Sequence, residues 1–290
     1  MPDTNILQDL SSALAGAAEA VAPSVVEIAS RKSLSTGFFW REGLIVTAEE
    51  ALADEGEIAV ELADGARHAV QLVGRDPATD VALLRLEGVA TRPAPLTTEL
   101  PRPGALTLLA AAAESAPLIA FGVVAVVRPA WRSMRGGHID ARIELDLRLR
   151  RRAEGGLALD ASGAPYGMAV RGPRGRTLVI PAATIERVAK LLLDHGGVPR
   201  GYLGLGLSEV GVDDGIGLMV VSVDASGPGA ASGMLQGDII LRWDGEPVPS
   251  LHRLLRSLDH MAIGRTVKLD LRRGGAPADA TLTVGTRPRR

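Results

Sequence analysis

The hydrophobic residues divide the chain into two sections with different patterns. Near the start, apolar residues recur at helical spacing and predict a short helix over residues 5–20. After Pro23 the pattern changes to short apolar runs separated by Gly and Asp turns, which predicts an all-β barrel or sandwich rather than βαβ units. The predicted strands are 24–30, 36–40, 44–47, 58–62, 69–74, 80–86, 105–110, 119–127, 141–147 and 168–170.

A second helix and a hinge close this first section. Residues 182–194 are amphipathic, and the following segment 195–199 contains Gly-Gly and Pro, which stop helix propagation. From Arg200 onward the order of elements changes, and the length fits one small domain. The predicted elements there are a strand–loop–strand ending at 217–223, a short helix in 227–233, a strand at 238–243, a helix at 250–258 and a hairpin over 266–284.

Composition limits the classes of function. The 290 residues are 46% hydrophobic, which is ample for real cores, and the net charge of −2 gives no field for nucleic acid or a membrane surface. Cysteine is absent, so a disulfide framework and a thiolate metal site are excluded, and we expect no cofactor. No run of 18 apolar residues and no export signal is visible. The compartment stays open: cytoplasmic as written, periplasmic or otherwise extracytoplasmic if the start has been trimmed.

A series of motifs extends over nearly the whole length of the chain. The first half contains Ala-Pro-Ser-Val-Val, Thr-Gly-Phe-Phe-Trp, Gly-Leu-Ile-Val-Thr-Ala and Val-Gly-Arg-Asp-Pro-Ala-Thr-Asp-Val-Ala-Leu-Leu. The second half contains Arg-Gly-Tyr-Leu-Gly-Leu and Leu-Gln-Gly-Asp-Ile-Ile-Leu. A series of motifs in a fixed order identifies a protein family far more specifically than a single motif does. The motifs begin at Ala22, Thr36, Gly43, Val73, Arg200 and Leu235.

In the order of these motifs the chain resembles the HtrA/Deg-type, trypsin-like serine proteases that carry a PDZ domain. The resemblance implies a mostly β fold: a trypsin-like double β-barrel with an N-terminal helix over 1–194, a hinge at 195–199, and a PDZ domain over 200–290. The family's catalytic histidine, aspartate and serine fall on Glu50, Asp80 and Glu154. The glycine of the oxyanion site falls on Arg152.

These substitutions bear directly on catalysis. Acyl transfer by this route needs a hydroxyl nucleophile, a neutral imidazole that takes its proton, and a carboxylate that orients the imidazole. Glu154 has no hydroxyl, and the carboxyl group of Glu50 titrates too low to replace imidazole unless burial shifts it strongly. If the fold holds, three carboxylates lie near one another, and we expect repulsion to raise at least one pKa or to push a side chain outward.

Several alternatives remain open for this site. Arg148, Arg150 and Arg152 would share one face of a continued strand and neutralise the carboxylates, or they form a solvated charged loop. The carboxylates could carry out acid–base hydrolysis as in glycosidases, bind a hard cation such as Ca²⁺, or be remnants of an eroded site. No replacement triad is visible among Ser162, His68, His138, His195, His252 and His260.

The second domain keeps its expected binding residues. PDZ domains add an extended peptide to a sheet edge and hold its terminal carboxylate with backbone N–H groups. The carboxylate loop matches Tyr202, Leu203, Gly204 and Leu205, and Arg200 could add charge attraction. An apolar stripe with helical spacing is either groove wall or core. Its residues are Leu251, Leu254, Leu255 and Leu258.

The sequence therefore predicts a catalytically inactive HtrA-like protein. We expect it to bind peptide or protein C-termini, or to regulate an active relative by mixed assembly. The resemblance also implies assembly as a homo-trimer. The alternatives are an active serine endopeptidase and a carboxylate-based hydrolase that uses Glu50, Asp80 and Glu154.

Overall fold

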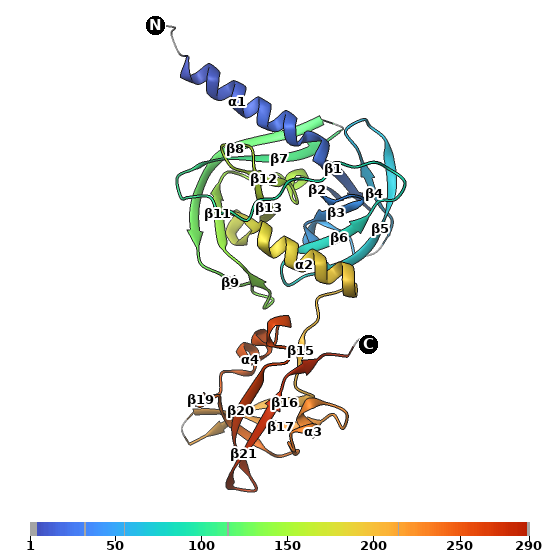
Figure 1. Cartoon of the computed structure of the whole chain (residues 1–290). Coiled ribbons are helices and arrows are strands. Elements are labelled where there is room, and N and C mark those ends of the chain that lie inside the picture. The colour runs from blue at the N-terminus through green and yellow to red at the C-terminus, as the bar shows by residue number, and fades with distance from the viewer. Residues whose placement is uncertain (1–4, 32, 55, 115, 214, 289–290) are drawn as a thin grey trace. The chain divides into compact units, whose positions relative to one another are not determined.

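Residues 1–198 and 199–290 form two units. The computed structural model describes residues 5–31, 33–54, 56–114, 116–213 and 215–288. Figure 1 shows the elements of each unit. The first unit contains two closed six-stranded barrels, and the second contains an antiparallel sheet, a separate two-stranded sheet and two short helices. The predicted mostly β fold is confirmed.

The first barrel is formed by the N-terminal strands in the order β1-β2-β3-β6-β5-β4. Strand β3 is buried along its whole length, as its unbroken Leu-Ile-Val run predicts for a strand covered on both faces. Turns with Gly or Asp connect β2 to β3, β4 to β5 and β5 to β6. The strands are β1 (Val25–Ser30), β2 (Ser33–Arg41), β3 (Leu44–Thr47), β4 (Ile58–Glu61), β5 (Arg67–Asp76) and β6 (Val81–Arg85).

The second barrel has the order β11-β14-β13-β12-β7-β8. Strands β12 and β14 are absent from the sequence prediction. Strand β12 is only three residues long, and β14 ends in a proline, which argues against a strand in sequence analysis. The strands are β7 (Leu106–Ala113), β8 (Ala116–Arg128), β11 (Arg142–Asp146), β12 (Leu157–Leu159), β13 (Pro165–Arg171) and β14 (Thr177–Pro181), with a small ribbon of β9 (Trp131–Arg132) and β10 (His138–Ile139).

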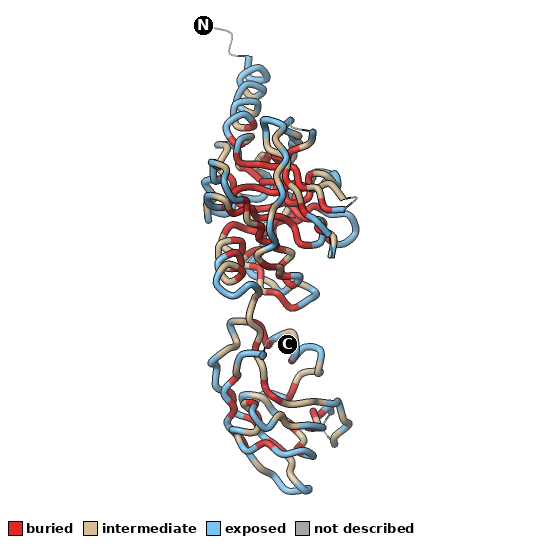
Figure 2. The backbone as a smooth tube through the Cα atoms, turned by 90° about the vertical axis from the view of Figure 1, so that its right-hand side faces the viewer, coloured by how far each residue is buried: buried red, intermediate tan, exposed pale blue. Residues whose placement is uncertain are grey.

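Helices complete the first unit. Helix α1 (Ile6–Val21) precedes the barrels, and α2 (Ala182–His195) packs on β5, β6 and β13. The α2 face that carries Ile185, Val188 and Leu192 is fully buried in a core shared by the two barrels. Figure 2 shows this buried interior. Helix α2 ends at Gly196, whose left-handed backbone (φ 67°) lets its N–H bond the carbonyl of Leu192 at 2.7 Å.

The second unit is built on a sheet with the order β16-β17-β18-β20-β21. Its core clusters around Leu218, Ile240, Leu254, Leu269 and Leu282. Among the described strands, β16 lies at the end of the sheet, so one of its edges is open. The elements are β15 (Gly201–Tyr202), β16 (Leu205–Val212), β17 (Gly215–Val223), α3 (Pro228–Ala231), β18 (Ile239–Trp243), β19 (Glu246–Pro247), α4 (Leu251–Ser257), β20 (Thr266–Arg273), β21 (Ala276–Thr283) and β22 (Gly285–Thr286).

Candidate functional sites

Three carboxylates from the two barrels meet in the first unit. Glu50 lies in the 3₁₀ turn Glu49–Ala51 after β3, and Asp80 immediately precedes β6. Glu154 follows the 3₁₀ turn Arg151–Ala153 in the second barrel. The N–H of Glu50 donates to Oδ1 of Asp80 at 2.8 Å, and the N–H of Thr36 donates to the carbonyl of Glu154 at 2.9 Å. Backbone contacts therefore fix all three residues around one site.

Burial and mutual repulsion act together on the aspartate. Burial raises the pKa of Asp80 to about 7, and the carboxylates of Glu50, Glu154 and Glu49 add to the shift, while the N–H of Glu50 opposes it. The pKa of Glu154, which is 7% exposed, is also raised by burial. A carboxyl group that titrates near neutrality is the main electrostatic property of this site.

A fourth carboxylate, Glu49, belongs to the cluster but is absent from the sequence prediction. Burial raises its pKa, against the attraction of Arg75 at 3.6 Å and Arg135 at 3.9 Å. The available signal is the Glu-Glu pair after the Ile-Val-Thr strand. In a 3₁₀ turn, neighbouring side chains point in different directions, so one glutamate is buried while Glu50 remains exposed.

The arginines beside these carboxylates are not the ones expected from sequence. Arg135 pairs with Glu50 at 3.3 Å, and Arg171 lies 3.6 Å from Glu154. The suggested role of Arg148, Arg150 and Arg152 is wrong, because β11 ends at Asp146 and the chain then turns. Arg152 instead pairs with Glu114 at 2.6 Å. The solvated-loop alternative describes Arg148 and Arg150, which are exposed.

The backbone at the expected oxyanion site closes on itself. The N–H of Glu154 donates to the carbonyl of Arg151 at 3.3 Å, and the N–H of Ala153 donates to the carbonyl of Arg150 at 2.9 Å. The carbonyl of Arg152 accepts from the hydroxyl of Thr36 at 2.7 Å. These contacts hold the segment in a 3₁₀ turn that directs the Glu154 N–H into the turn.

A hollow of ≈ 640 Å³ lies over Glu50 and Glu154. No histidine is among the described residues that line it. Its two serines are engaged: Ser33 donates to the carbonyl of Ala51 at 3.2 Å, and Ser30 accepts from Ala53 at 2.9 Å. Across the described part of the chain, no group of three or more His, Cys, Asp or Glu residues is arranged to hold a metal ion.

In the second unit, the loop between β15 and β16 presents backbone groups to the open sheet edge. The carbonyl of Leu203 accepts from Gly229 at 2.7 Å, and that of Gly204 accepts from Asp224 at 2.8 Å. Because C=O and N–H point in opposite directions across a trans peptide, the N–H groups of Gly204 and Leu205 face away from these partners. The sequence-predicted loop therefore turns donors toward the edge of β16.

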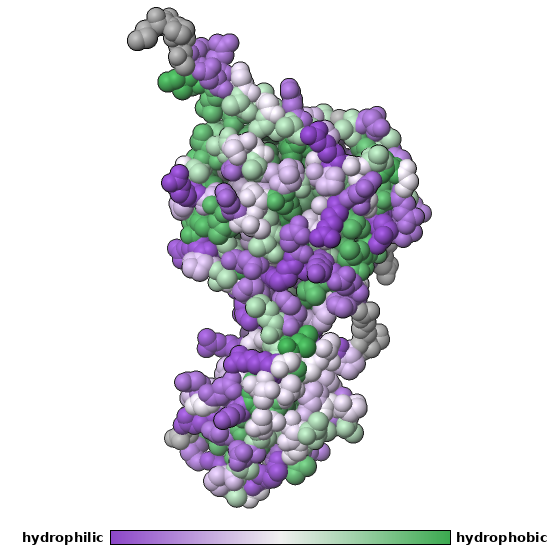
Figure 3. Space-filling model, viewed as in Figure 1, coloured by the Kyte–Doolittle hydropathy of each residue, from purple (hydrophilic) through white to green (hydrophobic). Residues whose placement is uncertain are grey.

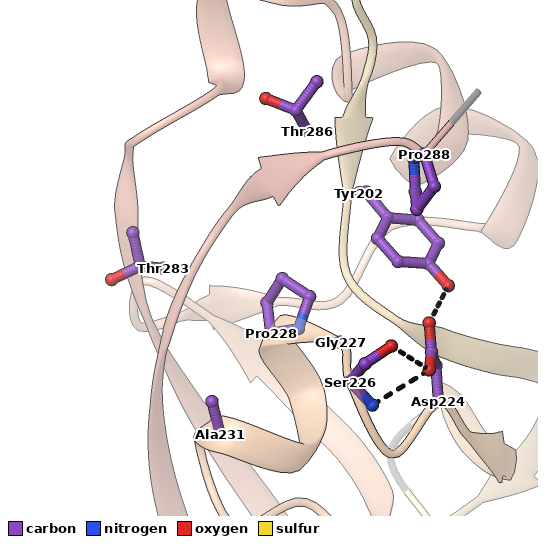
Figure 4. Close-up of a pocket in the computed structure, with 9 residues that line it drawn as sticks. All are labelled: Tyr202, Asp224, Ser226, Gly227, Pro228, Ala231, Thr283, Thr286 and Pro288. Atoms are coloured by element: carbon purple, nitrogen blue, oxygen red, sulfur yellow. Dashed lines mark hydrogen bonds between the residues drawn. The ribbon is translucent and has the colours of Figure 1, made fainter.

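Glycine is required at the centre of this loop. Gly204 has φ 69°, and a Cβ at this position would lie 2.8 Å from the Cα of Gly227. Beside the loop, the hydroxyl of Tyr202 donates to Oδ2 of Asp224 at 2.8 Å (Figure 4). Asp224 is missing from the sequence prediction, because its role depends on a contact across 22 positions. The side chain of Tyr202 thus supports the loop from the side of β17.

The leucine stripe of α4 divides between core and surface. Leu254 and Leu258 are buried core residues, Leu251 is half-buried, and Leu255 is 53% exposed. Helix α4 packs beside β16, and the N–H of Leu251 donates to Glu209 of that strand at 2.7 Å. Arg200 is half-buried, and its carbonyl accepts from Arg287 at 2.9 Å. Leu255 and Leu251 are thus the members of the stripe that a ligand can reach.

Comparisons with known proteins agree with these two units. Residues 35–168 match the trypsin-like peptidase domain, and residues 201–284 match the PDZ domain. A protein of Rhizobium meliloti (strain 1021) named "Probable periplasmic serine endoprotease DegP-like" is 28% identical over 276 residues, covering 89% of this chain and 54% of the relative. A protein of the same name from Pseudomonas putida (strain W619) is 29% identical, with 89% and 57% covered. The chain spans about half the length of these relatives.

Solved structures share the fold of this chain. The structure titled "HtrA-type protease AlgW with tripeptide" is 26% identical, covers 96% of this chain and 98% of that chain, and has a TM-score of 0.66. The serine endoprotease from Yersinia pestis shares the fold with a TM-score of 0.69 at 24% identity, covering 94% and 98%. The protein therefore consists of a trypsin-like peptidase domain followed by one C-terminal PDZ domain. In sequence and fold it is similar to proteins named HtrA-type protease and DegP-like serine endoprotease, as its motifs predict.

Proposed function

We propose that this protein is a catalytically inactive member of the HtrA family that binds peptide or protein C-termini through its PDZ domain. The observation that carries the proposal is the meeting of Glu50, Asp80 and Glu154 where peptide hydrolysis requires an imidazole, a carboxylate and a hydroxyl. Neither Glu50 nor Glu154 carries the imidazole or the hydroxyl group that this reaction uses.

The geometry of the oxyanion segment supports the same proposal. Stabilising a tetrahedral intermediate requires backbone N–H groups that point toward the reacting carbonyl. Here the N–H of Glu154 is held by the carbonyl of Arg151. Moreover, the buried carboxyl group of Glu154 would place negative charge beside a developing oxyanion, which raises its energy.

The PDZ unit supports the binding half of the proposal. Gly204 and Leu205 offer backbone donors for a terminal carboxylate, and the open edge of β16 can pair with an extended peptide. The N–H of Asp224 donates to the carbonyl of Gly204, beside the opposed residues Leu205 and Val223. Leu205 and Val223 are therefore not hydrogen-bonded to each other, and the N–H and C=O of Leu205 both face the open edge of β16. Leu255 of α4 supplies exposed apolar surface for a ligand side chain.

Assembly into a regulatory or scaffold subunit is part of this proposal. Near the start of α1, Ile6 is 75% exposed and Leu7 is 77% exposed. Figure 3 shows hydrophobic surface in this region, and apolar surface of this kind favours association. We expect a homo-trimer or a mixed assembly with an active relative. Light scattering of the purified chain and of its Ile6→Asp/Leu7→Asp variant measures whether the chain forms a homo-trimer.

The test of inactivity combines a fluorophosphonate probe with a casein degradation assay. We expect neither labelling nor cleavage by the full chain. Labelling that survives in Ser162→Ala and Ser24→Ala variants, together with casein cleavage, would overturn the proposal. An active protease of this family, assayed in parallel, establishes that the probe and substrate work under the same conditions.

Two enzyme functions compete with this proposal. The relatives named serine endoproteases favour an active serine endopeptidase, which the same assay would reveal. The pKa of about 7 at Asp80, beside two further carboxylates, favours a carboxylate-based hydrolase, because a carboxyl group that titrates near neutrality can act as a general acid. Hydrolysis of a glycoside panel that disappears in Asp80→Asn would support that second alternative.

The binding half is tested with a library of peptides that have free C-termini. We expect enrichment of sequences ending in apolar residues, and loss of binding in Gly204→Glu, whose side chain would collide with Gly227. Amidated versions of the enriched peptides should bind far more weakly, since they lack the terminal carboxylate. An absence of any enrichment would contradict the PDZ function and leave the inactivity question unaffected.

The described helices include none that is long and apolar enough to cross a membrane. The relatives are named periplasmic, and we propose the same kind of compartment for this protein. Measuring the chain in osmotic-shock and cytoplasmic fractions of its native cells tests this directly.

A further inference from the structure

The second barrel has a hollow that the functions proposed above do not use. It measures ≈ 1010 Å³ and lies between strand β8, the segment 147–153 and the end of β13. Its lining combines apolar side chains of β8 with four arginines and contains no acidic residue among the described positions. The arginines are Arg148, Arg150, Arg151 and Arg171.

The apolar part of the lining is unusually exposed. Of the three phenylalanines in the chain, Phe38 and Phe39 are buried, whereas Phe121 is 48% exposed. Ile119 is 39% exposed. Both residues lie two positions apart on β8, so their side chains are on the same face of the strand. Exposed apolar side chains beside a charged rim are typical of a binding surface.

The backbone of β8 also has an open edge here. Strand β11 pairs only with residues 123–128 of β8, whereas β7 pairs along its whole length. The N–H of Val124 donates to the carbonyl of Ala105 at 2.9 Å, which makes Leu106 and Val123 a non-hydrogen-bonded pair. By alternation, Ile119 and Phe121 turn their N–H and C=O groups away from β7. Among the described residues, no backbone bond to this part of the edge is made from the segment 147–151.

The charge of the rim points to the chemistry of the ligand. Arg148 and Arg150 make no ion pair with any described residue, and Arg171 pairs with Glu154 only at 3.6 Å. Several guanidinium groups without acidic neighbours in the lining repel one another and attract an anion. Guanidinium groups also pair with carboxylates through planar hydrogen bonds.

We propose that this hollow binds an extended segment of a partner protein that combines acidic and apolar residues. The segment adds as a strand to the open edge of β8 at Ile119 and Phe121, its apolar side chains cover these two residues, and its carboxylates pair with Arg148 and Arg150. This site needs no free C-terminus and is independent of the PDZ groove.

The probe is a fluorescein-labelled peptide with the sequence Glu-Leu-Asp-Val-Glu-Leu-Asp-Val, amidated at its C-terminus so that the PDZ loop cannot hold a carboxylate. Its binding to the full chain is followed by fluorescence anisotropy. We expect saturable binding that weakens at least about tenfold in Arg148→Glu/Arg150→Glu, because each reversal replaces attraction by repulsion. The matched control is Arg102→Glu/Arg128→Glu, which makes the same charge change at exposed arginines outside the hollow and should leave binding unchanged.

A second experiment tests strand addition without altering the protein. Alternate N–H groups of an added strand face its partner, so N-methylation of one alternating set in the peptide should abolish binding and that of the other set should be tolerated. If both methylated peptides bind equally well, the peptide does not add as a strand to the edge of β8. If Arg148→Glu/Arg150→Glu and Arg102→Glu/Arg128→Glu weaken peptide binding equally, the peptide does not bind in this hollow. Arg148-dependent binding to phosphatidylglycerol vesicles without binding to the peptide would also overturn the proposal, in favour of a lipid surface.

Discussion

The backbone N–H of Glu50 donates a 2.8 Å hydrogen bond to Oδ1 of Asp80. This bond joins the turn after β3 to the residue before β6, and it is made to a carboxyl group whose pKa is raised to about 7, chiefly by burial. Asp80 itself has φ 58°, a left-handed backbone that asparagine and aspartate adopt more readily than most residues other than glycine. The site therefore holds an aspartate in a position where neutral asparagine would suit both the backbone and the electrostatics.

We first predict that Asp80 makes the stability of the trypsin-like unit depend on pH. Its folded-state pKa of about 7 lies above the ordinary value of 3.8, so the folded chain binds more protons than the unfolded chain between these values. The free energy of unfolding should fall as the pH rises from about 4 to about 7 and then level off. Asp80→Asn should flatten this dependence and stabilise the unit at pH 8 by on the order of 2 kcal/mol, after allowance for solvent screening.

Urea denaturation at pH 4.5, 6 and 8 measures the effect. Trp40 and Trp131 lie in the first unit and Trp243 in the second, so a Trp243→Phe background restricts the fluorescence signal to the first unit. Asp64→Asn, in the exposed turn before β5, is the control and should leave the dependence unchanged. If the free energy of unfolding of Asp80→Asn depends on pH as steeply as that of the original chain, the carboxyl group of Asp80 is not the source of the pH dependence.

The second prediction concerns Gly155, which follows Glu154. Its φ is 89°, and a Cβ there would lie 2.0 Å from the carbonyl oxygen of Thr36 and 2.8 Å from the hydroxyl of Thr47. Gly155→Ala should destabilise the first unit by about 3 kcal/mol or more, because backbone strain adds to a collision between the two barrels.

Gly175→Ala is a matched control for this variant. Gly175 also has a positive φ (73°), but a Cβ there would meet nothing within 4 Å. Gly175→Ala should destabilise the first unit by only about 1 kcal/mol, because it adds backbone strain without a collision. Thermal unfolding by circular dichroism compares the two, and equal losses would mean that close contact at Gly155 has no role.

The sequence predicts the fold far better than the details of the site. The run Leu44–Thr47 coincides with β3, and the family motifs place Glu50, Asp80 and Glu154, which the structure brings together. The prediction of Arg148, Arg150 and Arg152 as partners is wrong because it assumes that the strand continues, whereas β11 ends at Asp146. The actual partners of Glu50 and Glu154, Arg135 and Arg171, depend on how strands and loops fold back on the site. Side-chain pairing of this kind depends on tertiary contacts that hydrophobic periodicity does not encode.

The third prediction concerns ligand binding by the PDZ unit. Leu255→Asp should weaken binding of a C-terminal peptide about tenfold, because it places a charge in the apolar wall of α4. Leu255 is 53% exposed, so the substitution should leave folding intact. Leu235→Asp makes the same change at a residue that is 54% exposed and distant in sequence from α4 and β16, and it should retain full affinity. Isothermal titration with one enriched peptide compares them, and parallel losses would argue against a groove at α4.

The last prediction concerns the buried aspartate of the Gly-Asp-Ile motif. Asp238 is 1% exposed and accepts from Arg273 at 2.8 and 2.7 Å and from the N–H of Leu235 at 2.8 Å. The Arg273 guanidinium lowers the pKa of Asp238 in the folded chain. The pair therefore stabilises the fold at any pH above the ordinary pKa of aspartate. This stabilisation is lost as the pH falls from that value through the lowered pKa of the folded state. Arg273→Met should destabilise the PDZ unit at pH 7, because the buried carboxylate of Asp238 loses its charged partner and keeps the N–H of Leu235.

The neighbouring Arg272→Met distinguishes a buried pair from a surface one. Arg272 pairs at 3.3 Å with Asp213, whose side chain is 86% exposed, and its loss should cost less than about 1 kcal/mol. Chemical denaturation followed by the fluorescence of Trp243, in a Trp40→Phe/Trp131→Phe background, measures both variants in the same unit. The two arginines are adjacent on β20, but only Arg273 bonds a buried carboxylate and also the carbonyl of Gly233 at 2.9 Å. Equal losses in the two variants would contradict a stabilising role for the Arg273–Asp238 pair.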